Sequence, residues 1–485
     1  MQRLCIVVVF SALVLGVGIK HEVLGQEAPE DTNIEEALSG FDDDDSGTLD
    51  EDVLSGFGDD DGFEVSSEDS ESENTDVSWS NIFGSAGLSV SYSYAREKPT
   101  DASKADWSGL TKMRPYLSLT WDVKLGDHWK TRISGKAFHD YAYSMKTRQA
   151  FSAEVLAELE QEAEMREVYL EGSPFGTLDV KLGNQIVAWG VANSLRVVDV
   201  LNPTDNREFG MTDLEDIRLP ATMTRLDYYI DDLKLEAVAV HQIKFNKIAP
   251  YGSDFNPSSL KSTEVIPESN AENTEFGLAV IGTFNGWDGS LHWAQYFDDT
   301  AHTSKMTQSM SGKKIEQSHS RLTMFGATLS VPSGSYLWKI EAATLHGMEF
   351  LNVTDKKFAR TDVLLGAEYS GWNDTQLVLE SGVQHLNDFD KKLEASPDLQ
   401  LETKLASTIS FVQDYLNQTV HLNLVGMMIG KHGEEGGINR ASLEYDVMDA
   451  FSVTGGVMVY QSGDNAFFKY INENDRIYFE TKYSF

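Results

Sequence analysis

The densest group of ionisable side chains of both signs beside rigid turns lies between Trp189 and Pro220. The dipeptides Asn202-Pro203 and Leu219-Pro220 make rigid turns there. If such a group lines the narrow lumen of a channel, its charges are screened less than charges on a surface. They can then select which solutes pass through the channel. Two placements are open: a segment folded inward to line a constriction, or an external loop held by its own salt bridges. The residues of interest are Asp199, Asn202, Asp205, Arg207, Glu208 and Arg218.

Motifs for other chemistry are weak. The sequence contains no Walker loop, dinucleotide fingerprint, zinc-ligand spacing or nucleophile elbow. Eleven histidines leave a barrel hydrolase with a Ser/His or Asp/His pair open, but no spacing singles out such a pair. An EF-hand-like run begins at Asp42, but its twelfth position is Val53 instead of a bidentate glutamate. We therefore expect no enzyme, no cofactor, no metal site and only loose counter-ion binding.

Alternating strands must position the charged group. Tyr116–Leu125 places Leu117, Leu119 and Trp121 on one face and Ser118, Thr120 and Asp122 on the other. The same alternation recurs at 375–385, 420–424 and 451–460. Repeated segments of about ten residues are typical of a transmembrane β-barrel.

The connections predict the strand number. Eight tight turns alternate with nine longer polar loops, which implies an all-β, transmembrane, antiparallel up-and-down barrel of about 18 strands (16–18). The long loops are expected to be extracellular and the short turns periplasmic. The turns fall at 126–128, 173–175, 231–232, 285–286, 333–334, 372–374, 416–418 and 448–449. The loops fall at 96–112, 146–164, 190–220, 246–273, 299–318, 349–360, 388–401, 431–437 and 462–474.

The last strand, 475–485, has an apolar and aromatic face. Phe479, Tyr483 and Phe485 share that face, and the alternation ends on Phe485. This pattern resembles the signal that the bacterial barrel-assembly machinery reads. The alternative is an amphipathic strand at the end of a soluble sandwich.

The N-terminal residues indicate to which cellular compartment the protein is sent. Residues 1–25 have the charge and apolar run of a secretory signal peptide, which contains the only cysteine, Cys5. Residues 26–80 form an acidic leader, expected to be disordered, in which Leu38–Asp45 recurs after 16 residues at Leu54–Asp61. The repeat is either a docking motif for a periplasmic partner or a solvated spacer. Residues 81–485 are assigned to the barrel, and the net charge of -38 excludes nucleic acid as a partner.

A helix is expected within one loop. Phe151–Arg166 is rich in helix-forming residues, and Val155, Leu156 and Leu159 have helical spacing. It is predicted either as a surface helix or as a helix inside the lumen.

The stretch from Leu182 to Pro220 resembles a family of uncharacterised bacterial outer-membrane proteins. The resemblance is carried by Leu182-Gly183-Asn184-Gln185, Trp189-Gly190, Asn202-Pro203-Thr204-Asp205 and Arg218-Leu219-Pro220. It implies a barrel associated with exporters of the RND superfamily that carry lipid-like cargo. The acidic leader and the small barrel depart from that family.

We therefore expect a bacterial outer-membrane barrel through which a solute or lipid-like molecule passes or is transferred, with an exporter as a periplasmic or inner-membrane partner. Outer-membrane lipid and lipopolysaccharide are the expected surroundings. The alternatives are a general diffusion porin, an outer-membrane hydrolase and a structural barrel. An open lumen favours the porin, a plugged lumen with a lateral opening favours lipid-like cargo, and a Ser/His pair within hydrogen-bond reach favours the hydrolase.

Overall fold

The structure is a computed structural model that describes residues 80–485 except 102, 213–216, 259 and 310–311. The expected signal peptide, nearly all of the acidic leader with its repeat, and the EF-hand-like run lie outside the described residues. None of the helices in the described part of the chain is long and apolar enough to cross a membrane.

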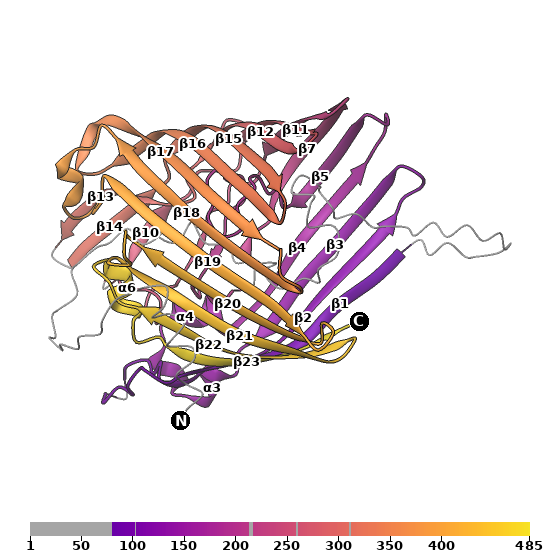
Figure 1. Cartoon of the computed structure of the whole chain (residues 1–485). Helices are drawn as coiled ribbons and strands as arrows, with labels where there is room; N and C mark the ends of the chain where they lie inside the picture. Colours follow the sequence, from indigo (N-terminus) through magenta and orange to yellow (C-terminus); the bar gives the residue numbers. More distant parts are fainter. Residues whose placement is uncertain (1–79, 102, 213–216, 259, 310–311) are drawn as a thin grey trace.

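The described residues form a closed antiparallel barrel of 18 strands, which Figure 1 shows from the side. The strands around the wall are β1 (Ser80–Ser93), β2 (Gly109–Lys124), β3 (Trp129–His139), β4 (Gln161–Gly172), β5 (Leu178–Gln185), β7 (Ala221–Ile230), β8 (Leu233–Val240), β11 (Glu275–Phe284), β12 (Trp287–Phe297), β15 (Arg321–Ser333), β16 (Tyr336–Phe350), β17 (Val353–Tyr369), β18 (Thr375–Asn387), β19 (Thr403–Tyr415), β20 (Val420–Ile429), β21 (Gly436–Met448), β22 (Phe451–Gln461) and β23 (Arg476–Ser484).

The barrel closes between its first and last strands. β1 and β23 pair antiparallel over nine residue pairs, ending at Ser93 opposite Arg476. Beyond them, the amide of Phe485 donates to the carbonyl of Gly84 at 2.9 Å, and the amide of Gly84 donates back at 2.8 Å. These bonds join the two edges of the sheet, as barrel closure requires. The predicted up-and-down barrel of about 18 strands is confirmed.

The two ends of the barrel differ as predicted. Eight connections at one end, the periplasmic end, have two to five residues: 125–128, 173–177, 231–232, 285–286, 334–335, 370–374, 416–419 and 449–450. Nine connections lie at the other end: 94–108, 140–160, 186–220, 241–274, 298–320, 351–352, 388–402, 430–435 and 462–475.

One of the nine predicted loops is wrong. Residues 349–360 belong to β16 and β17, whose hairpin turns over only Leu351 and Asn352. Its charged residues Lys356 and Lys357 are exposed, whereas Phe358 is buried. A hairpin that projects into water has its backbone paired by the ladder, so its outer side chains can be polar and read as a loop.

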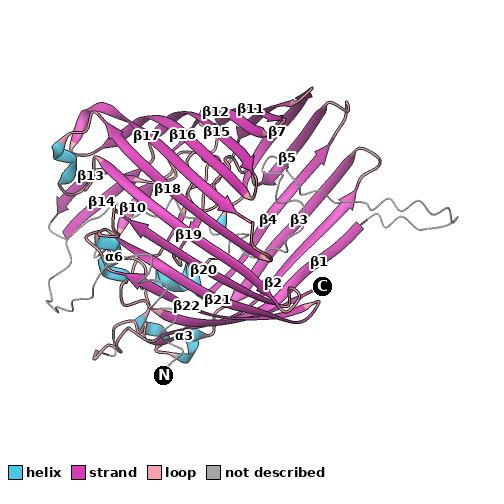
Figure 2. Cartoon of the chain, viewed as in Figure 1, coloured by secondary structure: helices cyan, strands magenta, loops and turns pink. Residues whose placement is uncertain are grey.

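The long connections contain short helices and strands, as Figure 2 shows. Two small sheets join β10 (Ser262–Val265), β13 (His302–Ser309) and β14 (Gly312–Ser318), and β6 (Asp205–Asn206) with β9 (Lys247–Ile248). The helices are α3 (Ala142–Met145), η2 (Arg148–Ala150), α4 (Ala153–Val155), η3 (Leu156–Glu160), η4 (Lys391–Glu394) and α6 (Ala466–Ile471). The loop predicted over 299–318 therefore contains a hairpin.

The helix predicted over 151–166 is half right. It ends at Glu160, and Gln161 begins β4. From there Ala163 and Met165 face outward while Glu162 and Glu164 bind Lys247 inside, a period of two that the β3 ladder imposes on helix-forming residue types. The helical half packs Val155 and Leu159 in a cluster with Trp107, Tyr143 and Phe151.

The wall has an apolar outside and a more polar inside. Leu117, Leu119 and Trp121 of β2 are exposed on the outer surface, as are Phe479, Tyr483 and Phe485 at the last strand. An apolar outer band of this kind suits contact with lipid.

Candidate functional site

The longest connection, 186–220, leaves the wall after β5 and returns to it at β7. Asn202 ties its two ends together from a fully buried position (0 % exposed). Its side-chain oxygen accepts from the amide of Val187 at 2.8 Å, and its side-chain nitrogen donates to the carbonyl of Leu219 at 2.9 Å. Because the side chain of Asn202 bonds to backbone groups at both the start and the end of the segment, it holds the segment as a closed loop.

One side of this segment packs against an apolar part of the wall. Trp189, Leu195, Val198 and Leu201 are buried together with side chains of β7, β8, β12, β15, β16 and β17. The indole nitrogen of Trp189 donates to Glu236 of β8 at 2.6 Å. The segment therefore lies inside the barrel, against wall strands that range from the adjoining β7 to the distant β17.

Two wall carboxylates hold the backbone of the segment. Glu341 of β16 accepts hydrogen bonds from the amides of residues 191, 192 and 198. Glu380 of β18 accepts from the amides of residues 193, 194 and 195, at 2.6, 2.8 and 3.2 Å. Gly190 precedes them with φ +100°, and a Cβ there would lie 2.6 Å from a carboxylate oxygen of Glu341. Glycine at 190 is thus required by both the backbone conformation and the space.

Asp199 lies at the centre of a buried ion cluster. Its Oδ2 is 3.1 Å from Nε of Arg196 and 3.0 Å from Nε of Arg218, and its Oδ1 accepts from the amide of Trp189. Burial opposes ionisation, but the two guanidinium groups outweigh it and lower the pKa of Asp199. The carboxylate therefore stays charged and crosslinks the segment.

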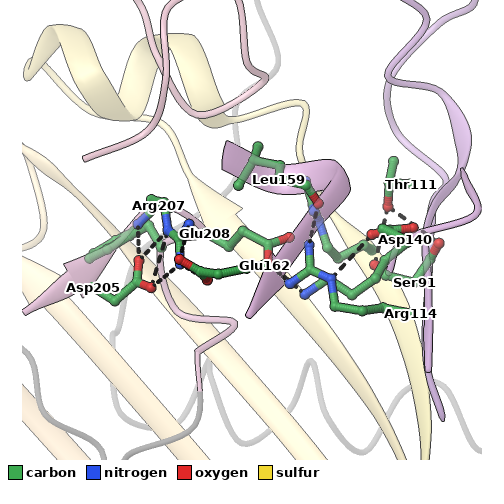
Figure 3. Close-up of polar contacts among 12 residues, drawn as sticks. Ser91, Thr111, Arg114, Asp140, Leu159, Glu162, Asp205, Arg207 and Glu208 are labelled. Atoms are coloured by element: carbon green, nitrogen blue, oxygen red, sulfur yellow. Dashed lines mark hydrogen bonds and ion pairs between the residues drawn. The ribbon is translucent and has the colours of Figure 1, made fainter. Parts of the chain in front are cut away.

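Arg207 joins the segment to the wall on the opposite side. Its Nε lies 2.9 Å from Oδ1 of Asp205, and its Nη2 lies 2.8 Å from Oε2 of Glu162 of β4 (Figure 3). Its Nη1 donates to the carbonyl of Glu158 at 2.8 Å. Burial opposes the charge, but the two carboxylates outweigh it and raise the pKa of Arg207.

Glu208 binds two cations of the wall. It lies 2.9 Å from Nζ of Lys112 and 2.7 Å from Nη1 of Arg114, both on β2. Arg114 also binds Asp140 and the carbonyl of Leu159, so the helical loop is attached to the same network (Figure 3). Burial alone raises the pKa of a carboxyl group, but Arg114 and Lys112 hold the pKa of Glu208 well below its usual range.

A cavity of about 110 Å³ remains between the segment and strands β1 to β4 and β23. It is lined by ionisable side chains of both signs: Lys112, Arg114, Lys136, Arg166, Arg207, Glu162, Glu164, Asp205, Glu208 and Glu480. Tyr116 and Phe138 contribute its aromatic surface.

The structure places the six predicted site residues on one inward segment, but in two clusters. Asp205, Arg207 and Glu208 line the cavity, whereas Asp199 and Arg218 form the second ion cluster and Asn202 is a structural clasp. Arg207 binds Asp205, and Arg218 binds Asp199. Their influence on what passes stays a prediction.

Sequence reasoning missed the wall partners. Lys112, Arg114, Glu162, Glu341 and Glu380 all occupy inward positions of alternating strands. Glu380 was recognisable as the polar side of the strand at 375–385, but nothing in that pattern shows which inward carboxylate meets the segment.

A Ser/His pair does occur inside the barrel. Oγ of Ser290 lies 2.6 Å from Nε2 of His292, both on β12. Each residue exposes only 5 % of its surface, and the Trp189 ring lies against His292 with centroids 4.8 Å apart. Among the described residues, none forms a hydrogen bond with Nδ1 of His292, so none of their carboxylates orients the imidazole as a catalytic triad requires.

Comparison with known proteins agrees with the fold. The sequence profile described as "Protein of unknown function (DUF1302)" matches residues 36–485. A comparison with curated proteins finds no match. Among solved structures, OccAB3 of Acinetobacter baumannii is similar at 9 % identity, with a TM-score of 0.50 over 84 % of this chain and 99 % of that chain.

Two further structures are more distant. OpdK of Pseudomonas aeruginosa, solved with vanillate, has 8 % identity and a TM-score of 0.46 over 84 % of this chain and 98 % of its own. A loop-deletion mutant of OmpT, an outer membrane protein of Vibrio cholerae, has 10 % identity and a TM-score of 0.41 over 84 % and 99 %. The closed 18-stranded barrel with its apolar outer band places the chain in the bacterial outer membrane.

Proposed function

This chain belongs to the family described as "Protein of unknown function (DUF1302)", and we propose that it forms a selective passage for a small charged or amphiphilic molecule across the outer membrane. One observation carries the proposal: the anchored segment 186–220 lies across the inside of the barrel and leaves a small cavity lined by charges of both signs.

The size and charge of the cavity favour selection over general diffusion. Its volume of about 110 Å³ is below the roughly 300 Å³ or more of pockets that enclose drug-sized ligands. Arg207 and Glu208 already bind carboxylates and cations of the wall, so a solute that enters must exchange with these ion pairs. A general diffusion porin, our sequence-based alternative, needs a wider aqueous lumen.

The test is the conductance and ion selectivity of single barrels in planar bilayers. Arg207→Ala removes a cation from the cavity, and we expect a shift of the reversal potential toward cation preference. Arg132→Ala is the matched control, because Arg132 also faces the lumen in an ion pair, with Asp122 at 2.9 Å, but does not line this cavity. An unchanged reversal potential for Arg207→Ala, in a barrel that still folds, contradicts the proposal.

The hydrolase alternative has one observation in its favour, the contact between Ser290 and His292. We propose that this pair is structural, because Trp189 covers it and Thr328 shares the serine hydroxyl. A serine-reactive phosphonate should therefore leave the native barrel unlabelled. Labelling that disappears in Ser290→Ala would favour the hydrolase.

The partnership with an RND-superfamily exporter is a further proposal and rests on the family resemblance alone. Crosslinking in intact cells, followed by purification of the barrel, would test it: recovery of an inner-membrane exporter supports the partnership, and recovery of envelope lipids alone contradicts it.

A further inference from the structure

The barrel wall is incomplete beside β4. β4 pairs with β3 along its whole length, from Gln161 to Gly172, but it pairs with β5 only from Val168 to Gly172. On the β5 side, no strand of the described residues pairs with 161–167. The chain has turned into the barrel after Gln185, where the adjoining strand β7 also begins.

This gap lies at the level of the apolar outer band. Ala163 and Met165 of β4 are exposed and face outward, and they are in register with Ala137 and Gly135 of β3. Through β3 they lie level with Leu117 and Leu119 of β2, whose side chains are exposed and apolar. Residues 161–167, which have no strand partner on the β5 side, span roughly 23 Å along β4. Strand edges at membrane depth are tolerated only where they are covered by protein or border water.

Ionisable groups lie directly behind the gap. The inward side chains of this part of β4, Glu162, Glu164 and Arg166, line the cavity described above. Nζ of Lys247 lies 2.8 Å from Glu162 and 3.0 Å from Glu164, and all three side chains are half-buried. The missing wall is thus spanned by long side chains rather than by a backbone ladder.

Lys244 adds a cation that forms no ion pair with the described residues, although Glu164 lies near enough to interact with it electrostatically. Its ammonium donates to the carbonyl of Pro220 at 2.8 Å, and no carboxylate of the described residues lies within ion-pair distance of it. An anionic group could bind there, near Lys247. The exposed apolar side chain of Met165 lies on the outer face of the same stretch of β4 that carries Glu164.

We propose that the gap between β4 and β5 is a lateral window for a single-chain amphiphile with an anionic head. The head reaches the ionisable groups behind β4, and the chain stays against the apolar outer surface. This inference rests on the proposed function, since it names the route and the class of molecule for the same cavity.

The experiment bridges the window covalently. The only cysteine of the sequence, Cys5, lies in the predicted signal peptide, so Glu164→Cys with Lys247→Cys can be joined by a short bis-maleimide. Lys130→Cys with Glu171→Cys is the matched control, because these residues also form a Lys–Glu contact, at 3.6 Å, near the periplasmic turn. Transfer of a fluorescent long-chain carboxylate out of the outer leaflet of proteoliposomes is measured before and after bridging, and heat-modifiable mobility checks that each variant is folded.

Compared with the same double variant before the bridge is added, bridging the window should stop transfer of the probe, whereas the control bridge should leave transfer unchanged. Lys244→Met, without any bridge, should slow transfer about tenfold, the effect of one charge-assisted hydrogen bond. Transfer at the unbridged rate, or an equal loss of transfer with the control bridge, would overturn the lateral route. The selectivity of Arg207→Ala decides the proposed function separately.

Discussion

Glu380→Ala offers the sharpest test of how the inward segment is held. The carboxylate of Glu380 accepts three amide hydrogen bonds, from Asn193, Ser194 and Leu195. It is 3 % exposed, so water does not compete for these amides in the native state. We expect the substitution to release this part of the segment and to increase conductance through the barrel.

The magnitude follows from the hydrogen bonds. Each bond to a charged group contributes about 1.5–3 kcal/mol, so three contribute roughly 4.5–9 kcal/mol before the released amides are hydrated. If hydration of the released amides recovers about half to two-thirds of this free energy, the net loss in anchoring free energy is about 3 kcal/mol. That loss changes the ratio of released to anchored segment about 150-fold.

Single-channel recording in planar bilayers measures this ratio as the fraction of time spent at the higher conductance. Asp362→Ala is the control: this carboxylate is 2 % exposed on β17, between the two anchoring strands, but its ion pair is with Arg360 of its own strand at 2.9 Å. The reasoning is refuted if Glu380→Ala folds into a heat-modifiable barrel with wild-type conductance, or if Asp362→Ala raises conductance equally.

Three further outcomes are expected. Deleting Phe485 removes the hydrogen bonds it exchanges with Gly84 across the closing seam, and should lower the yield of heat-modifiable barrel in the outer membrane; an unchanged yield contradicts this role. Gly190→Ala should destabilise the anchored segment by about 1–3 kcal/mol, because φ is +100° and the new Cβ meets Glu341, and limited proteolysis of the folded barrel should detect it; wild-type resistance speaks against strain. The lowered pKa of Glu208 means that its ion pairs stabilise the fold above the ordinary carboxyl pKa and are lost only as pH falls through the lower folded-state value. The difference in ion selectivity between the wild type and Glu208→Gln should therefore stay constant from neutral pH to about pH 4.5, and a titration of that difference near the ordinary pKa would disprove the pairing.

The barrel could be predicted because its signal is repeated. Each strand such as 116–125 shows a period of two, and the eight short turns recur where expected. The prediction was wrong where residue types that favour a helix or a polar loop mask the period of two. Residues 161–166 have strong helix propensity and yet begin β4, because the ladder with β3 holds this stretch extended. The polar hairpin at 349–360 stands above the apolar band and lacks the outward apolar residues that mark a strand.

The site was predictable only from its own segment. The rigid turns and mixed charges between Trp189 and Pro220 are local features, and the contacts of Arg207 with Asp205 span two residues. The anchors Glu341 and Glu380 are 143 to 187 residues away from the amides they bind. Many inward glutamates share their pattern, so only the three-dimensional register distinguishes them.

That separation has a consequence for assembly. The segment leaves the wall after the fifth strand, but its carboxylate anchors arrive with β16 and β18, deep in the second half of the chain. Contacts between residues this far apart form late, because loop-closure entropy must be overcome first. During insertion the sheet must therefore grow around an interior that is not yet filled, and the segment can settle only when the eleventh and thirteenth wall strands are present. Fixing the interior and closing the seam then become neighbouring late events of one folding sequence.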